Sequence, residues 1–321
     1  MKYPVLVLVG PTAVGKTAIS VAVAKRLGAE IISGDSMQVY RGMDIGTAKI
    51  TPEEMQGVPH HMIDIKNPDE PFTVAEFQER TDRLIREIVG RGRLPMLVGG
   101  TGLYIRSVLE PYTFTPMEGD PELRRQLAAE EEQHGPGHLH RRLQEVDPKA
   151  AAKLHPNDLR RIIRALEVYT LTGIPISSTQ TAAGAEPRYD DLFLALTMDR
   201  EALYRRIEQR VDQMLAAGWL EEVRRLLERY PPHLPAMQAL GYRELVQYYR
   251  GLLTLPEATA LIKRNTRRFA KRQFTWFRRE RRLRWIDVTS AEARASVVEA
   301  IAQMAEGKWP EGVEAVLRGQ K

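Results

Sequence analysis

The 321-residue chain contains no cysteine, no long apolar run, no internal repeat and no low-complexity segment. Without cysteine it forms neither disulfide bonds nor thiolate metal sites, which agrees with a reducing compartment, so we expect a cytoplasmic protein. A membrane-spanning helix needs roughly 20 apolar residues. The N-terminal run Val5–Val9 is far shorter and is typical of a buried strand rather than a secretory signal. We therefore expect no membrane partner.

The formal net charge of +5 is moderate, but basic residues are unevenly distributed. Residues 1–120 are nearly balanced, whereas residues 263–284 contain eleven Lys or Arg and a single acid, Glu280. A basic segment of this kind is expected at a surface that binds a polyanion such as a nucleic acid. A solvated helix face is the alternative, and the segment taken alone favours it.

Strands and helices alternate through the first third of the chain. Apolar runs predict strands and helical spacing predicts helices, in the order Val5–Val9, 16–27, Glu30–Ser33, 74–89, Pro95–Val98 and 103–109. Such alternation implies an α/β fold, with a parallel sheet flanked by helices. Ligands of such sheets bind at the carboxyl ends of the strands, where three polar loops lie: Gly10–Thr17, Gly34–Ser36 and Gly99–Gly102.

The pattern changes near residue 115. Residues 115–189 are rich in Arg, Glu, Leu and Ala and are punctuated by prolines, which predicts a mostly helical insertion domain. The strand-like run Asp191–Thr197 follows, so the core is expected to comprise residues 1–114 and 190–321. A long amphipathic helix ending at Gly218 and a basic helix around 263–280 complete this core.

The first polar loop has a specific sequence. GPTAVGKT (10–17) matches G-x-x-x-x-G-K-[ST] completely, after a strand and at the start of a helix, which predicts a P-loop NTPase-like core. Its backbone amides and helix N-terminus would bind phosphate oxygens, Lys16 would add a cation, and the Thr17 hydroxyl would ligate Mg²⁺. The predicted phosphate contacts are Gly10, Thr12, Ala13, Val14, Gly15, Lys16 and Thr17.

The motif does not say which phosphate compound binds. Asp35 ends the second strand in a polar turn, where it could accept a proton from a nucleophile, assist the metal or cap a helix. Thr101, on the third loop, could orient a nucleophile or cap the next helix. The residues alone leave these alternatives open.

Six ordered blocks between residues 4 and 287 resemble the tRNA dimethylallyltransferases, the isopentenyltransferases of tRNA. The blocks are GPTAVGKT (10–17), SGDSMQVYRGMDIGTAK (33–49), LVGGTGLYIRSVL (97–109), HPNDLRRIIRALEVY (155–169), GYRE (241–244) and KRQFTWFR (271–278). The resemblance implies transfer of a dimethylallyl group from dimethylallyl diphosphate to the exocyclic amine of an adenosine. That adenosine would lie 3′ to the anticodon in tRNAs that read codons beginning with U. Pyrophosphate would leave and Mg²⁺ would be required, and the loop would bind the prenyl diphosphate rather than ATP.

The resemblance also assigns roles to residues. Asp35 would accept the proton of the adenine amine with Thr101 as a second contact, and Arg210 would bind the leaving pyrophosphate, with Arg206 as the alternative. The partner would be the anticodon stem-loop of tRNA, with its target adenine turned outward, and the protein would act as a monomer. The implied tRNA contacts are Asp35, Ser36, Met37, Gln38, Thr101, Arg124, Arg160, Arg161, Arg164, Gly241, Tyr242, Arg243, Lys271, Arg272, Gln273 and Arg278.

The aromatic residues of the basic helix have a different expected role. Phe269, Trp276 and Phe277 share one helical stripe with Gln273, which favours packing in the core over contact with RNA. The arginines facing the other way are the better candidates for binding RNA.

Three other functions fit parts of the sequence. A small-molecule or nucleotide kinase would use the phosphate loop but leaves the insertion and the basic helix without a role. An isopentenyltransferase of free adenine nucleotides shares the chemistry but does not need a macromolecular surface. An RNA-binding ATPase would be expected to have a second acidic strand end, which the sequence lacks.

Overall fold

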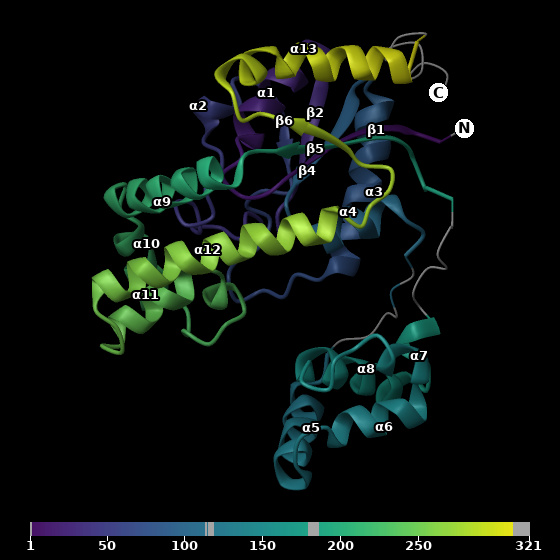
Figure 1. Cartoon of the computed structure of the whole chain (residues 1–321), viewed down its shortest axis with the longest axis vertical. Coiled ribbons are helices and arrows are strands. Elements are labelled where there is room, and N and C mark those ends of the chain that lie inside the picture. Colours follow the sequence, from purple (N-terminus) through teal and green to yellow (C-terminus); the bar gives the residue numbers. More distant parts are fainter. Residues whose placement is uncertain (1, 113, 115–118, 179–185, 311–321) are drawn as a thin grey trace. The chain divides into compact units, whose positions relative to one another are not determined.

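The computed structural model describes residues 2–112, 114, 119–178 and 186–310 (Figure 1). The chain forms two compact units, of which the first comprises Met1–Leu109 and Pro187–Lys321 and the second Glu110–Glu186. The chain thus leaves the first unit once and returns to it, a few residues from the limits 115 and 189 expected from the sequence. None of the helices described is long and apolar enough to cross a membrane.

The first unit is built on a six-stranded sheet whose paired strands are all parallel, in the order β3-β2-β4-β1-β5-β6. The strands are β1 (Pro4–Val9), β2 (Ala29–Gly34), β3 (His60–His61), β4 (Leu94–Gly99), β5 (Asp190–Thr197) and β6 (Arg284–Asp287). β1 is central and every one of its residues is buried, which explains its unbroken apolar run. Val9 and Gly34 both lie opposite Gly99, so the loops after β1, β2 and β4 share one edge of the sheet. The predicted α/β fold is confirmed.

Helices cover both faces of the sheet because alternate side chains of β1 point to opposite faces. On one face pack α1 (Lys16–Leu27) and α13 (Ala291–Lys308), which lie against each other (Figure 1). On the other pack α3 (Val74–Gly90) and α4 (Gly102–Leu109). Both faces are therefore dry, and the sheet edge is the place left for a ligand.

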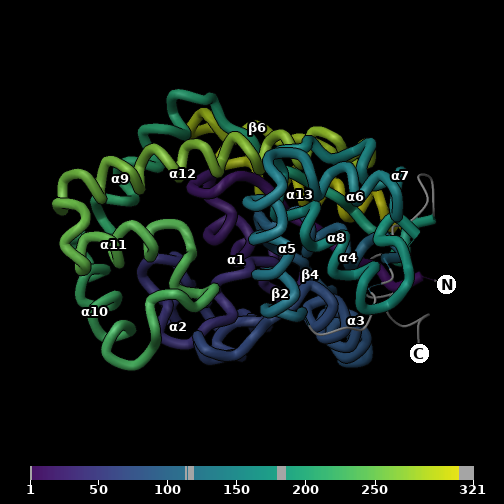
Figure 2. Tube along the Cα trace, turned by 90° about the horizontal axis from the view of Figure 1, so that it is seen from below, coloured from purple at the N-terminus to yellow at the C-terminus, as the bar shows by residue number. Residues whose placement is uncertain are grey.

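A second hydrophobic core in the first unit joins four helices to the segment after β2. The helices are α9 (Arg200–Ala216), α10 (Trp219–Arg229), α11 (Tyr242–Tyr249) and α12 (Leu255–Phe277), with the short 3-10 helix η2 (Ala236–Gln238) before α11. α12 runs from α10 and α11 to α4 (Figures 1 and 2). It begins earlier than the predicted 263 because Thr254 and Glu257 form a capping box, and it ends at Phe277 rather than 280.

Helices are the regular elements among the described residues of the second unit, which has a hydrophobic core of its own. It contains α5 (Pro121–His134), α6 (His138–Val146), α7 (Pro148–Ala151), α8 (Leu159–Thr172) and the short η1 (Ile176–Ser178). Pro121 and Pro148 occupy first turns, where the missing N–H costs nothing, so these prolines start helices rather than break them. No role was predicted for the segment 179–188, and most of it lies outside the described residues.

Candidate functional site

The phosphate loop has a backbone shaped for an anion. Gly15 has φ +106°, a conformation that favours glycine, and Ala13 adopts the left-handed region at φ +66° despite its side chain. Among the described residues, no acceptor is recorded for the amides of Ala13 and Gly15. α1 begins at Lys16, and the first amides of a helix lack intrahelical acceptors. The loop therefore presents several free N–H donors next to the positive end of a helix.

Lys16 lies beneath this loop. Its Nζ donates to the carbonyl oxygens of Gly10 and Pro11, at 2.9 and 2.7 Å. Burial and the neighbouring Arg210 guanidinium lower the pKa of Lys16 to about 7, although the Asp35 carboxylate opposes the shift. An ammonium with so low a pKa gains its charge most readily when an anion arrives beside it.

Two arginines of α9 lie at the same loop. Arg206 approaches Gly15 so closely that a Cβ there would be 3.7 Å from its Nη2. Burial lowers the pKa of Arg210, one turn further on, against the opposing effect of Asp35. In the described part of the chain neither guanidinium forms an ion pair with a carboxylate. The sequence left the choice between these arginines open; the structure brings both to the loop, as suits an anionic ligand with two phosphates.

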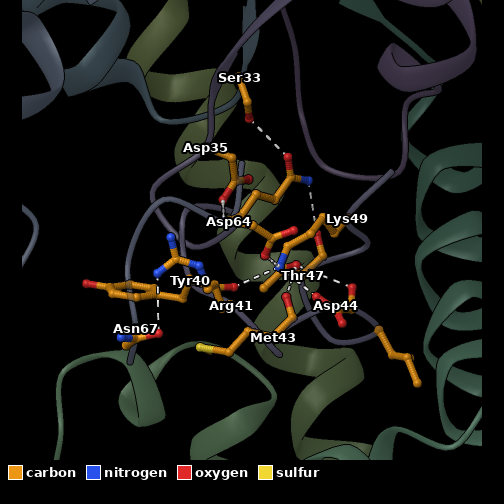
Figure 3. A network of polar contacts seen from close by, with 12 residues as sticks. Ser33, Asp35, Tyr40, Arg41, Met43, Asp44, Thr47, Lys49, Asp64 and Asn67 are labelled. Atoms are coloured by element: carbon orange, nitrogen blue, oxygen red, sulfur yellow. Dashed lines mark hydrogen bonds and ion pairs between the residues drawn. The ribbon is translucent and has the colours of Figure 1, made fainter. Parts of the chain in front are cut away.

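Asp35 uses one carboxylate oxygen to hold its own turn. Oδ1 accepts the amides of Met37 and Gln38 at 2.8 and 3.3 Å, whereas Oδ2 has no hydrogen bond recorded to the described residues (Figure 3). Asp35 thus caps its own turn and not a helix, which was the structural alternative that the sequence left open. It also leaves the second oxygen of a half-buried carboxylate available next to Lys16 and Arg210.

The segment that follows Asp35 is fixed by its own polar side chains (Figure 3). The Gln38 amide accepts from Ser33 Oγ at 3.0 Å and donates to the Thr47 carbonyl at 3.3 Å. Lys49 Nζ binds the Tyr40 carbonyl at 2.7 Å, and it pairs with Asp44 and Asp64 at 2.6 Å each. Gln38, predicted as a tRNA contact, therefore has a structural role in holding this turn, while Ser36 and Met37 are half-buried.

Glu222, on α10, was not predicted and holds the same segment from the far side. Its buried carboxylate accepts the amides of Asp44, Ile45 and Gly46 at 2.7 to 3.2 Å. It also accepts the Tyr242 hydroxyl at 2.6 Å. An acid on the apolar face of an amphipathic helix is the only signal that the sequence offered for this role.

Two predicted tRNA contacts near α11 have a structural role in the core. Tyr242 is fully buried, with its hydroxyl on Glu222. Gly241 is buried too: its amide donates to Glu244 at 2.7 Å, and a Cβ there would lie 2.1 Å from the Trp219 indole. These residues match the family block because they shape the core. Arg243 is exposed and remains a candidate contact.

The predicted residues of α12 lie on two faces of the helix, one buried and one exposed. Gln273, a predicted tRNA contact, has a buried side chain that binds the phosphate loop. Phe277 packs in the core as expected, but Trp276 is 38% exposed. The indole lies against Gly102, where a Cβ would be 2.1 Å from it, so the absence of a side chain at Gly102 makes room for the indole. The basic residues Lys271, Arg272 and Arg278 are exposed, and Phe269 is half-buried.

Predicted contacts in the second unit also divide. Arg124 and Arg164 bind the fully buried Glu167 at 2.8 and 2.6 Å. Burial alone would raise the pKa of Glu167, but hydrogen bonds from both arginines hold it below its usual range. Arg160 and Arg161 are exposed and line a cavity of about 500 Å³. All four stay candidate contacts, two of them with an additional structural role.

The predicted metal site rests on one protein ligand. Within the described residues, no three His, Cys, Asp or Glu side chains converge to hold a metal ion. Thr17 is exposed at the start of α1, beside the free loop amides. A magnesium ion here would take the Thr17 hydroxyl as a ligand and complete its shell with diphosphate oxygens and water, a coordination that this ion commonly adopts.

Thr101 is half-buried and accepts the Tyr104 and Ile105 amides through its carbonyl.

Comparisons with known proteins agree on one family. The family model described as IPP transferase matches residues 38–280. A protein of Symbiobacterium thermophilum named tRNA dimethylallyltransferase is 74% identical and covers 97% of each chain. One of Geobacillus kaustophilus with the same name is 53% identical, over 96% of this chain and 98% of the relative.

Solved structures lead to the same family. The tRNA isopentenylpyrophosphate transferase of Bacillus halodurans is 47% identical and superposes with a TM-score of 0.73 over 99% of this chain and all of the other. A eukaryotic dimethylallyltransferase, described as acting on tRNA, has a TM-score of 0.79 at 30% identity. It matches 95% of this chain and 78% of its own.

Proposed function

Because this chain belongs to the IPP transferase family, we propose that it transfers a dimethylallyl group from dimethylallyl diphosphate to tRNA. The acceptor is the exocyclic amine of the adenosine 3′ to the anticodon, in tRNAs that read codons beginning with U. One observation supports this most directly. The phosphate loop has free amides and is flanked by the cationic side chains of Lys16, Arg206 and Arg210, with the Asp35 carboxylate beside them. A diphosphate pocket next to a proton acceptor suits prenyl transfer to an amine.

The diphosphate side of the site stabilises a leaving group. When the allylic C–O bond breaks, positive charge develops on the allyl carbon and negative charge on the departing oxygens. Donors already fixed around those oxygens lower the barrier, because little reorganisation is needed as the charge develops. The loop amides, Lys16 and the two arginines are such donors. Bound Mg²⁺, held by Thr17, would supply further positive charge to the same oxygens.

The acceptor side activates a weak nucleophile. The lone pair of the adenine amine is delocalised into the ring, so removal of its proton must accompany bond formation. Asp35 Oδ2 is the group we assign to that proton, because Oδ1 is already used by the turn. Thr101, on the adjacent loop at the same sheet edge, is assigned a second contact with the base.

The tRNA contacts lie on both units. In the first unit the exposed basic side chains of α12 bind phosphates of the anticodon stem-loop, and in the second unit Arg160 and Arg161 do so. The target adenine must leave its stack to reach the sheet edge, as for other enzymes that modify bases. We further propose that the protein acts as a monomer in the cytoplasm, where its tRNA substrate occurs.

A single assay tests the function. The enzyme is incubated with unmodified tRNA, labelled dimethylallyl diphosphate and Mg²⁺, and the RNA is digested to nucleosides. Prenylated adenosine from tRNAs with adenosine 3′ to the anticodon is the expected product. Parallel reactions with adenosine monophosphate as acceptor, or ATP as donor, distinguish a free-nucleotide transferase and a kinase. Product in either of those alone would contradict the proposal.

The two arginines of α9 are expected to contribute separately to diphosphate binding. Arg210→Ala and Arg206→Ala should each lower kcat/KM for dimethylallyl diphosphate by about 10- to 100-fold, since each removes charged hydrogen bonds. Steady-state kinetics at saturating tRNA measures the effect. Arg205→Ala, an exposed neighbour on the same helix, serves as the control. Unchanged kinetics in both variants would place the diphosphate elsewhere.

The basic face of α12 is expected to act on tRNA alone. Arg272→Gln with Arg278→Gln should weaken tRNA binding and flatten the slope of log affinity against log salt by about 1 to 2, because two phosphate contacts are lost. Affinity for the prenyl diphosphate should not change. Arg83→Gln with Arg86→Gln, two exposed arginines on α3, makes the same change in charge elsewhere. An equal effect of both pairs of substitutions would show that α12 acts only through the general charge of the protein.

A further inference from the structure

One buried amide side chain joins two of the loops at the sheet edge. Gln273 projects inward from α12 and is 6% exposed. Its Oε1 accepts the Thr12 amide at 2.9 Å, and its Nε2 donates to the Gly100 carbonyl at 3.0 Å. The orientation of the amide follows from these partners, because Thr12 offers only a donor there and Gly100 only an acceptor.

These two contacts fall on loops that serve different substrates. Thr12 lies in the phosphate loop, directly before the free amide of Ala13. Gln273 thus takes the amide of Thr12, a predicted phosphate contact, and leaves the amides of Ala13 and Gly15 free. Gly100 directly precedes Thr101, which faces the acceptor in the proposed reaction. One side chain thus connects the donor loop and the acceptor loop.

The packing around this amide is tight. A Cβ at Gly100 would lie 2.3 Å from Gln273 Nε2, so the glycine permits the close approach of the amide. The neighbouring Lys271 and Arg272 are exposed on the opposite side of the same helix. α12 therefore carries both the inner contact between the loops and the outer surface assigned to tRNA.

We propose that Gln273 is a positioning residue: its side-chain amide sets the separation of the phosphate loop and the Thr101 loop, and with it the approach of the amine to the allyl carbon. This inference rests on the proposed prenyl transfer. A displacement of about 1 Å between reacting groups can cost about 100-fold in rate, so two hydrogen bonds at this point suffice for a large effect.

Two variants separate positioning from packing. Gln273→Met keeps the length and burial of the side chain but loses both hydrogen bonds. Gln273→Glu is isosteric with Gln when protonated, and then it accepts from Thr12 and donates to Gly100. When ionised, it repels the Gly100 carbonyl instead, and burial beside that carbonyl raises the pKa of the introduced carboxyl.

The measurement is the single-turnover rate constant for prenylation of tRNA from pH 6 to pH 8.5, with each value divided by that of the wild type. We expect the rate constant of Gln273→Met to be about 10- to 100-fold lower than that of the wild type at every pH, with little change in affinity for either substrate. Gln273→Glu should approach the wild type as the pH falls. A Gln273→Met rate within twofold of wild type, or a Gln273→Glu ratio independent of pH, would overturn the proposal.

Hydrogen exchange at the Thr12 amide supplies a readout that needs no turnover. It should be slow in the wild type and fast in Gln273→Met, whereas equal protection would show that Gln273 does not hold the loop. If the wild-type enzyme prenylates no tRNA, the proposed function falls, and Thr12 exchange still decides whether Gln273 holds the two loops.

Discussion

Asp35→Asn is expected to lower kcat by about 100- to 10,000-fold while leaving the fold and tRNA binding intact. The asparagine carbonyl can replace Oδ1 and accept the Met37 and Gln38 amides, so the turn is preserved. Its NH₂ then occupies the position of Oδ2. That group cannot take a proton, and it faces the adenine amine donor to donor. Single-turnover prenylation, binding of the anticodon stem-loop and thermal unfolding measure the three properties.

A second variant separates the two roles of Asp35. Asp35→Ala loses both the proton acceptor and the turn contact, so it should show a similar fall in kcat together with a lower Tm. Asp35→Asn should keep the wild-type Tm. Near-normal turnover in Asp35→Asn would remove Asp35 from the chemistry and leave it as a residue that holds the turn.

Local sequence patterns predicted the sheet and the phosphate loop because both are encoded within short segments. The buried run of β1 and the GPTAVGKT block each specify a local structure, and parallel strands must bring their carboxyl ends together. The strand pattern also placed Asp35 at this edge, and the resemblance to a family assigned its role. The two arginines of α9 follow from ordinary helical spacing, one turn apart.

Contacts between distant segments were not predictable in the same way. Gln273 reaches Thr12 across 261 residues, and Glu222 reaches the Asp44 amide across 178. Gln273 and Glu222 are buried polar residues on the apolar faces of their helices, and from the sequence alone they interrupt an apolar pattern without an evident reason. The matched family blocks marked Gln273 and Tyr242 as important, but they did not reveal that both side chains hold distant segments together.

Trp276 was expected in the core and is instead 38% exposed. Its helical position agrees with a core stripe, but its indole lies over Gly102, where the absence of a side chain makes room for it. Which face a residue at the margin of a stripe adopts depends on the partner helix, here the start of α4. Spacing within one helix does not contain that information.

Lys16→Met is expected to make the free protein more stable and to lower its kcat/KM for the prenyl diphosphate strongly. The Lys16 side chain is half-buried beside Arg210, and its pKa is about 7 instead of its ordinary value of 10.5. Below pH 7 both the folded and the unfolded chain carry the proton, so the folded state bears the full cost of the buried charge. Between pH 7 and 10.5 the unfolded chain binds a proton that the folded chain lacks, so the free energy of unfolding of the wild type rises with pH.

Methionine fills similar space without a charge, and its advantage should therefore be largest at pH 6 to 7 and should shrink as the pH rises. We expect roughly 1 to 3 kcal/mol in the free energy of unfolding at pH 6.5, since a half-buried ammonium keeps part of its hydration. Urea denaturation at pH 6.5 and 9 measures this difference. Lys25→Met, an exposed lysine on the same helix, should show neither effect.

The same substitution should lower kcat/KM for dimethylallyl diphosphate by about 100- to 1,000-fold, because the cation that meets the leaving oxygens is gone. In the wild type, diphosphate binding above pH 7 must draw a proton onto Lys16, so its affinity should fall as the pH rises, by up to about tenfold per pH unit. Calorimetry of diphosphate binding at pH 8 in buffers of different ionisation enthalpy measures the proton uptake. Proton uptake that persists in Lys16→Met would show that another group takes the proton. The low pKa of Lys16 would then have no function in diphosphate binding.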